Sequence, residues 1–117
     1  MLDEAVHTHE ANVRCRLVLD NTGYMQWGDR ETSLSPAETR MVRELLSTRT
    51  GVVSRRQLAL LAGTEVRRGL DAHIYRLRHK LSVFYNLELE TVPKRGFRIN
   101  LTPKNPMPIH VELSRAS

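Results

Sequence analysis

The first patterned segment of the chain alternates between apolar and polar positions. Residues 13–19 place Val, Cys, Leu and Leu at every second position, and a period of two predicts a β-strand. The Asp-Asn-Thr-Gly run at 20–23 has the composition of a turn. Two more short strands are predicted at residues 24–28 and 31–34. Together these strands predict a small antiparallel meander.

The pattern then changes to the spacing of a helix. Ser35 precedes Pro36 and Glu38, which together have the form of a capping box with proline at the first helical position. Apolar residues at 41–46 form a stripe along one side. We expect this first helix to end near residues 47–50.

Two further helices are predicted. Ser54 and Gln57 form a second capping box, and Gly63 is placed to end the short helix that follows. The third helix begins within residues 66–70 and continues to about Tyr85. Helices joined by so short a link indicate a relative of the helix-turn-helix.

The third helix has two contrasting faces. Apolar residues recur every three or four positions: Leu70, Ile74, Leu77, Leu81 and Phe84. At 100° per residue the opposite face carries Arg68, Ala72, Tyr75, Arg76 and His79, with Arg78 and Lys80 on its flanks. One face is therefore expected in the core and the other in solvent.

Strand-like segments at 87–92 and 97–101 flank a Pro-Lys-Arg-Gly turn, which predicts a hairpin with a basic tip. Residues 1–12 are interpreted as a flexible arm, residues 13–101 as one domain and residues 102–117 as an extended tail with three prolines. Within that tail, residues 109–113 have strand composition but no partner that the pattern identifies. The predicted fold class is α+β, a winged helix-turn-helix.

Positive charge is concentrated in one part of the 117-residue chain. Residues 1–53 carry a net charge of −2, residues 54–98 carry +6 and residues 99–117 carry +1. A contiguous basic segment is typical of a surface that binds a polyanion, although a solvated basic face has the same composition.

Other function classes find little support. One cysteine, Cys15, excludes an intramolecular disulfide, and the chain has neither a long apolar run nor the apolar core of a signal peptide. We therefore expect a cytoplasmic protein. His7, His9 and Glu10 lack the further ligands of a metal site. No Gly-rich phosphate loop or activated nucleophile is recognisable, so neither an enzyme nor a cofactor is expected.

The third helix suits the major groove of DNA, which admits one α-helix. Arg76 lies at the centre of the outward face, where a guanidinium can bond guanine O6 and N7, and Tyr75 and Ala72 can contact a thymine methyl. Phosphate contacts are expected from Arg68, Arg78, His79 and Lys80. Lys94 and Arg95, at the hairpin tip, suit a narrow minor groove.

Four motifs carry a resemblance to a known family: LSPAE at 34–38, VSRRQL at 53–58, LDAHIYRLRHKL at 70–81 and TVPKRGFR at 91–98. With these motifs the chain resembles the C-terminal DNA-binding domain of OmpR/PhoB-type response regulators over residues 13–101. The resemblance implies a four-stranded N-terminal sheet, a third helix in the major groove and a wing in the minor groove. It also implies a homodimer on tandem half-sites.

The resemblance assigns base contacts to Arg76 and Arg78, and a groove or phosphate contact to His73. Asp71 either orients a nearby arginine or complements the helix dipole. The complete set of predicted DNA-binding residues is Arg55, Arg56, Arg68, Asp71, Ala72, His73, Tyr75, Arg76, Arg78, His79, Lys80, Lys94, Arg95 and Arg98.

Three features depart from the family pattern. No receiver domain precedes the meander, so the chain is either a standalone regulator or the detached effector domain of a longer one. The segment at 62–69 is short and lacks a tryptophan, which disfavours activation through RNA polymerase and favours repression or an accessory role. Pro93 stands where many members have an arginine. Two alternatives remain, a winged helix that binds an acidic protein partner or another regulator and, less strongly, an RNA-binding domain.

Overall fold

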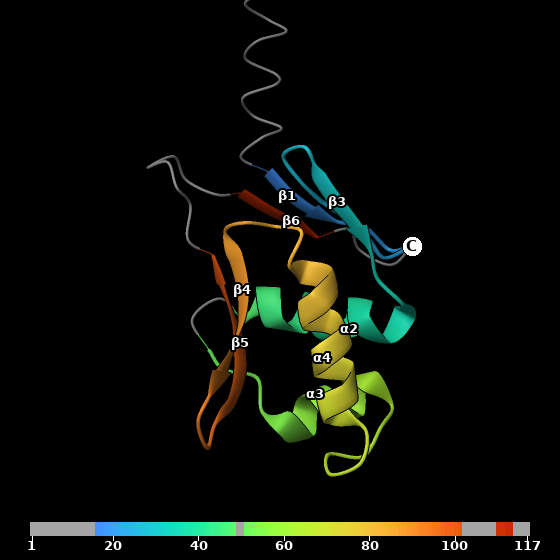
Figure 1. Cartoon of the computed structure of the whole chain (residues 1–117), viewed down its shortest axis with the longest axis vertical. Helices are drawn as coiled ribbons and strands as arrows, with labels where there is room; N and C mark the ends of the chain where they lie inside the picture. The colour runs from blue at the N-terminus through green and yellow to red at the C-terminus, as the bar shows by residue number, and fades with distance from the viewer. Residues whose placement is uncertain (1–15, 49–50, 102–109, 114–117) are drawn as a thin grey trace, which may run out of the picture.

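The computed structural model describes residues 16–48, 51–101 and 110–113. The predicted arm, residues 13–15 of the first strand and most of the tail lie outside this part of the chain. The elements follow in the order β1 (Arg16–Leu19), β2 (Tyr24–Trp27), β3 (Arg30–Ser33), α2 (Pro36–Ser47), α3 (Arg55–Ala62), α4 (Leu70–Leu81), β4 (Leu87–Val92), β5 (Gly96–Leu101) and β6 (His110–Leu113) (Figure 1). The predicted α+β class and winged-helix arrangement are confirmed.

The sheet at one end of the molecule has the strand order β3-β2-β1-β6. β1, β2 and β3 form the predicted antiparallel meander, with Leu19 beside Met25 and Gln26 beside Glu31. The fourth strand is β6, which runs parallel to β1 along its free edge. The resemblance implied four N-terminal strands, whereas in the described chain the fourth comes from the C-terminal segment that the sequence pattern left unplaced.

The predicted helix starts are accurate because they depend on local chemistry. Ser35 caps α2, its side chain accepts from the Glu38 N–H, and the Glu38 carboxylate accepts from the Ser35 N–H at 2.7 Å. In α3 the Ser54 side chain accepts from the Gln57 N–H, which is the serine half of the predicted box. Gly63 ends α3 with a φ of 70°, a left-handed conformation that suits glycine.

The predicted end of the third helix is about four residues too late. The Ser82 N–H bonds to the carbonyls of both Arg78 and His79, and the Ser82 hydroxyl donates to the His79 carbonyl at 2.5 Å. Phe84 then bonds back three residues to Leu81. These bonds tighten the last turn beyond α-helical geometry, and Phe84 reaches the core from the connection instead of from the helix.

A single core joins the two sheets and the three helices. The predicted apolar residues of α4 are all buried, and they pack with Leu17 and Met25 of the N-terminal sheet and with Phe97 of the hairpin. Figure 1 shows the sheet over one end of the helices and the β4–β5 hairpin beside them, with its tip near α3. This packing fixes the orientation of the hairpin relative to α4.

Candidate nucleic-acid interface

Helix α4 presents a polar surface opposite its buried face. Asp71, Ala72, Arg76 and His79 are exposed, and Tyr75 is 75% exposed. His73 and Lys80 are half-buried on the flanks. Burying one face of this helix therefore leaves the predicted DNA-contacting face in solvent, as a helix that enters the major groove requires.

An arginine from α3 ties the start of α4 to the hairpin. The Arg55 guanidinium lies 2.7 Å from the Asp71 carboxylate and stacks over the Phe97 ring at 5.5 Å. Asp71 also lies in the first turn of α4, where the helix dipole favours negative charge. Both interpretations that the sequence left open for Asp71 thus hold together, with Arg55 as the arginine that it orients.

A second arginine ties the last turn of α4 to the hairpin. Arg78 donates to the Leu89 carbonyl at 3.1 Å and to the Thr91 hydroxyl at 2.6 Å, and its guanidinium lies 5.9 Å from the centre of the Phe97 ring. Sequence reasoning missed Thr91. Thr91 lies directly across from Phe97 in the hairpin, and cross-strand partners share a face of the sheet. The predicted hairpin pairing could therefore have placed Thr91 on the same face as Phe97.

The hairpin tip is a tight turn closed by the Arg95 N–H and the Val92 carbonyl at 3.0 Å. Pro93 occupies its second position, and Lys94 has a φ of 65° at the third, which is the pattern of a type II turn. Lys94 and Arg95 are both exposed. The turn therefore holds two cations at the tip on a constrained backbone.

The tip end of the hairpin is anchored beside α3. Val53 and Phe97 exchange two backbone hydrogen bonds of 2.9 Å, and Gly96 lies close to the Val53 carbonyl. A groove of about 580 Å³ opens between the start of α3 and the hairpin, and its lining includes Arg56, Val66 and Lys94. Val66 was not among the predicted site residues. The groove therefore brings the arginines at the start of α3 to the same opening as the two cations of the tip.

Two predicted site residues are engaged elsewhere in the fold. The Lys80 ammonium lies 2.6 Å from the Glu38 carboxylate, which is buried. Burial acts to raise the pKa of Glu38, but the hydrogen bond from Lys80 and those from Ser35 outweigh it and lower the pKa. Arg98 pairs with Glu90 at 2.7 Å, and hydrogen bonds from Arg98 and Asn100 lower the pKa of that carboxyl.

Other predicted cations stay exposed. Within the described part of the chain, the side chains of four arginines and one lysine of the predicted or adjacent surface form no hydrogen bond or ion pair: Arg56, Arg67, Arg68, Arg76 and Lys94. No group of three or more metal-binding side chains occurs in the described part of the chain, and His7 and His9 lie outside it. No helix in the same part is long and apolar enough to cross a membrane.

The fold and this surface define a winged-helix domain. Its exposed polar surface is formed by helix α4 and by the basic turn of the β4–β5 hairpin. The family described as transcriptional regulatory protein, C terminal, matches residues 29–99. The chain belongs to this family, which confirms the predicted OmpR/PhoB-type relationship and makes the domain a DNA-binding one in transcription regulation.

Solved structures agree with this fold. The C-terminal domain of the nisin resistance regulator NsrR, a lantibiotic response regulator, is 26% identical, with 76% of this chain and 94% of that chain covered and a TM-score of 0.63. The DNA-binding domain of the response regulator AdeR in complex with an intercistronic region has 20% identity, coverage of 74% and 95%, and a TM-score of 0.60. The DNA-binding domain of E. coli CadC has 19% identity, coverage of 69% and 81%, and a TM-score of 0.58. No curated protein matches the sequence.

Proposed function

We propose that the domain binds a specific duplex DNA sequence, with α4 in the major groove and the hairpin, as the wing, in the minor groove. The observation that carries the proposal is the outward face of α4, where exposed Ala72, Tyr75 and Arg76 project from a helix whose other face is buried. Arg55 and Arg78 fix the wing relative to this helix. One rigid surface can then follow both grooves.

The contacts divide between bases and phosphates. Arg76, for which no intramolecular partner is recorded in the described chain, suits bidentate bonding to a guanine, and Tyr75 and Ala72 suit a thymine methyl. Arg78 already donates to Leu89 and Thr91. We therefore assign Arg76 as the principal base contact and Arg78 as a residue that sets the wing angle.

The remaining exposed residues suit the DNA backbone. Phosphate contacts carry no sequence information but fix the register of the protein. We assign them to cations and polar residues around α4 and at the wing tip: Arg56, Arg68, His73, His79, Lys94 and Arg95.

We further propose that the domain represses transcription or acts as an accessory factor. The α3–α4 connection is only residues 63–69 and has no tryptophan, which leaves little surface there for RNA polymerase. Two copies on tandem half-sites would place their centres about 10–10.5 base pairs apart. Such a regulator would act in the cytoplasm. A protein-interaction role is the second candidate, favoured by Leu60, which is 72% exposed on α3.

The test begins with selection of bound duplexes from a random pool, followed by sequencing, which gives the site and the half-site spacing. Arg76→Ala should then cost about 1–3 kcal/mol at the selected site and relax specificity at one base position. Arg30→Gln is the matched control, because it also removes an arginine charge but lies outside the proposed DNA contacts, beside Tyr85 in the connection that follows α4. Unchanged binding of Arg76→Ala to every duplex would contradict the assignment, and a pool without enrichment would favour the protein-interaction role.

A further inference from the structure

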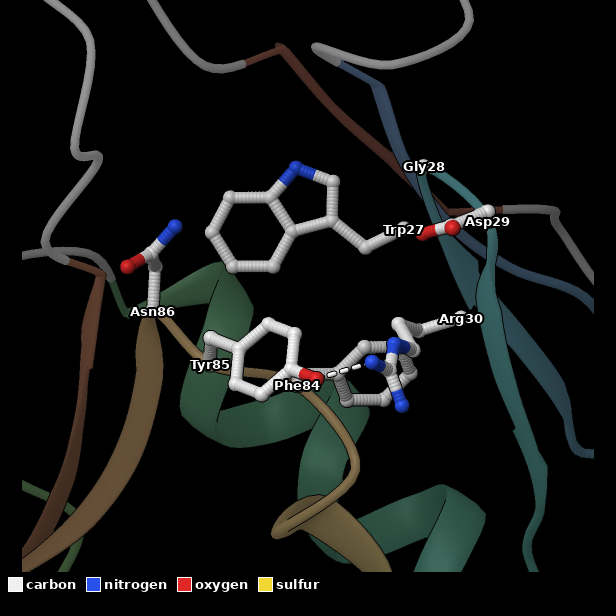
Figure 2. Close-up of a pocket in the computed structure, with 7 residues that line it drawn as sticks. All are labelled: Trp27, Gly28, Asp29, Arg30, Phe84, Tyr85 and Asn86. Carbon is white, nitrogen blue, oxygen red and sulfur yellow. Dashed lines mark hydrogen bonds between the residues drawn. The ribbon is translucent and has the colours of Figure 1, made fainter.

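A second recess lies where the β2–β3 turn meets the connection between α4 and β4 (Figure 2). Its volume is about 390 Å³. Trp27, Asp29 and Arg30 line it from the β2–β3 side, and Tyr85 and Asn86 line it from the other side. None of the residues assigned above to DNA contact borders this recess.

The walls of the recess present two aromatic rings. Trp27 packs against the core on one side, and Figure 2 shows its indole on the opposite side of the opening from the Tyr85 ring. Tyr85 is 70% exposed, which is a large fraction for a side chain with so much apolar surface. A flat ring that entered the opening would remove water from both aromatic surfaces and gain stacking contacts.

Arg30 supplies a positive charge at the same place. Its guanidinium lies 4.4 Å from the centre of the Tyr85 ring and donates to the Tyr85 hydroxyl. No carboxylate pairs with Arg30 among the described residues, and Asp29, which also lines the recess, forms no recorded ion pair with it. A guanidinium has five donors, so this one retains donors for the two oxygens of a carboxylate.

We propose that this recess binds a small aromatic carboxylate, with the ring between Trp27 and Tyr85 and the carboxylate on Arg30. The combination of two ring surfaces and a guanidinium without a carboxylate partner in the described chain selects this class, because a saturated acid lacks the stacking contacts and an amine would be repelled by Arg30. The recess is also lined by Phe84, which lies in the connection after α4 and is buried in the core. The recess lies beyond the C-terminal end of α4, and none of the proposed DNA contacts lines it, so ligand and DNA would bind to different residues.

The chain carries its own reporter, because Trp27 is the only tryptophan among the 117 residues. The full chain is titrated with phenylacetate, cyclohexylacetate and 2-phenylethylamine while tryptophan fluorescence is followed. Phenylacetate should give a saturable change with a Kd on the order of 1 mM, as expected for a fragment-sized ligand. The saturated acid and the amine should each bind at least about fivefold more weakly. Equal responses to all three probes, no saturable response or tighter binding of the amine would overturn the proposal.

Substitutions at exposed positions locate the site. Arg30→Gln should weaken phenylacetate binding about tenfold, as expected for loss of a charge-assisted hydrogen bond, and Tyr85→Leu should weaken it several-fold. Arg95→Gln at the wing tip removes the same charge outside the recess and should leave the Kd unchanged. Undiminished binding by both recess variants, with melting temperatures like that of the parent, would refute this site. The DNA affinity of Arg30→Gln is measured in parallel, so that failure of one proposal is separable from failure of the other.

Discussion

The ion pair between Glu38 and Lys80 predicts how one substitution changes stability and its dependence on pH. Glu38 is 3% exposed, and its carboxylate accepts from the Ser35 N–H at 2.7 Å and from the Lys80 ammonium at 2.6 Å. Lys80→Met removes the charge while retaining an unbranched apolar side chain of similar length. The buried carboxylate then keeps only its bonds within the capping box.

The expected cost follows from the burial of the two partners. Removing one member of a fully buried pair costs about 3–5 kcal/mol. The Lys80 side chain is 36% exposed, so solvent screens part of the interaction, and the bonds from Ser35 persist. We therefore expect Lys80→Met to lower the free energy of unfolding by about 1–3 kcal/mol, or several degrees in Tm for a domain of this size.

The pH dependence provides the control. Burial would raise the pKa of Glu38, but the bonds from Lys80 and Ser35 lower it in the native protein, so the stabilisation is complete above the unfolded pKa of about 4.3. It is lost as the pH falls through the lower native value. The stability gap between the parent and Lys80→Met should therefore be largest at neutral pH and shrink in acid.

The assay is urea unfolding of the parent, Lys80→Met, Glu38→Gln and the double variant across that pH range. Each single variant leaves one charge without its partner, whereas the double variant leaves none. The double variant should therefore be less destabilised than the sum of the two single variants. DNA affinity should change little in Lys80→Met once the folded fraction is taken into account. Parental stability of Lys80→Met at neutral pH, or a gap that does not shrink in acid, would refute this account of the pair.

Two predictions concern the wing. Lys94→Ala and Lys94→Gly both remove the tip cation and should weaken binding to all duplexes alike. Only Lys94→Gly relieves the φ of 65°, so its free energy of unfolding should exceed that of Lys94→Ala by about 0.5–1 kcal/mol and its melting temperature should be higher. Equal melting temperatures would contradict the turn geometry. Gly96→Ala should cost about 1–3 kcal/mol in urea unfolding, because a Cβ there would lie 2.1 Å from the Val53 carbonyl oxygen. A parental unfolding midpoint would show that the tip end of the wing is not packed against Val53 in this way.

The elements most accurately predicted from sequence depend on nearby residues. The capping box of α2, the serine cap of α3, the left-handed Gly63 and the apolar stripe of α4 each follow from residues within a few positions of one another. The end of α4 was predicted too late because Phe84 continues the apolar period after the helix has stopped. The apolar period indicates which residues are buried but not where the helix stops. The hydrogen bonds of Ser82 end the helix without changing the period of buried residues.

The pattern of apolar and polar residues could not predict which distant segments of the chain pair with each other. β6 pairs with β1 across most of the chain length, and four residues of strand composition contain nothing that selects this edge over another. Lys80 was assigned to DNA because a helical projection shows only its own helix. The projection omits α2, whose Glu38 reaches Lys80 from 42 positions away.

These ion pairs and hydrogen bonds reduce the number of cations in the basic segment that are available to contact DNA. Residues 54–98 contain ten arginines and lysines, but Arg55, Lys80 and Arg98 form ion pairs and Arg78 bonds to β4, which leaves six. All six are exposed: Arg56, Arg67, Arg68, Arg76, Lys94 and Arg95. Each neutralised phosphate contributes about −0.9 to the slope of log K against log salt concentration. If all six cations contact phosphates, the slope for one domain should therefore be about −5, and it should not be steeper. The four engaged residues have structural partners instead: Arg55 and Arg78 connect α4 with the wing, Lys80 binds Glu38 of α2, and Arg98 pairs with Glu90 within the wing.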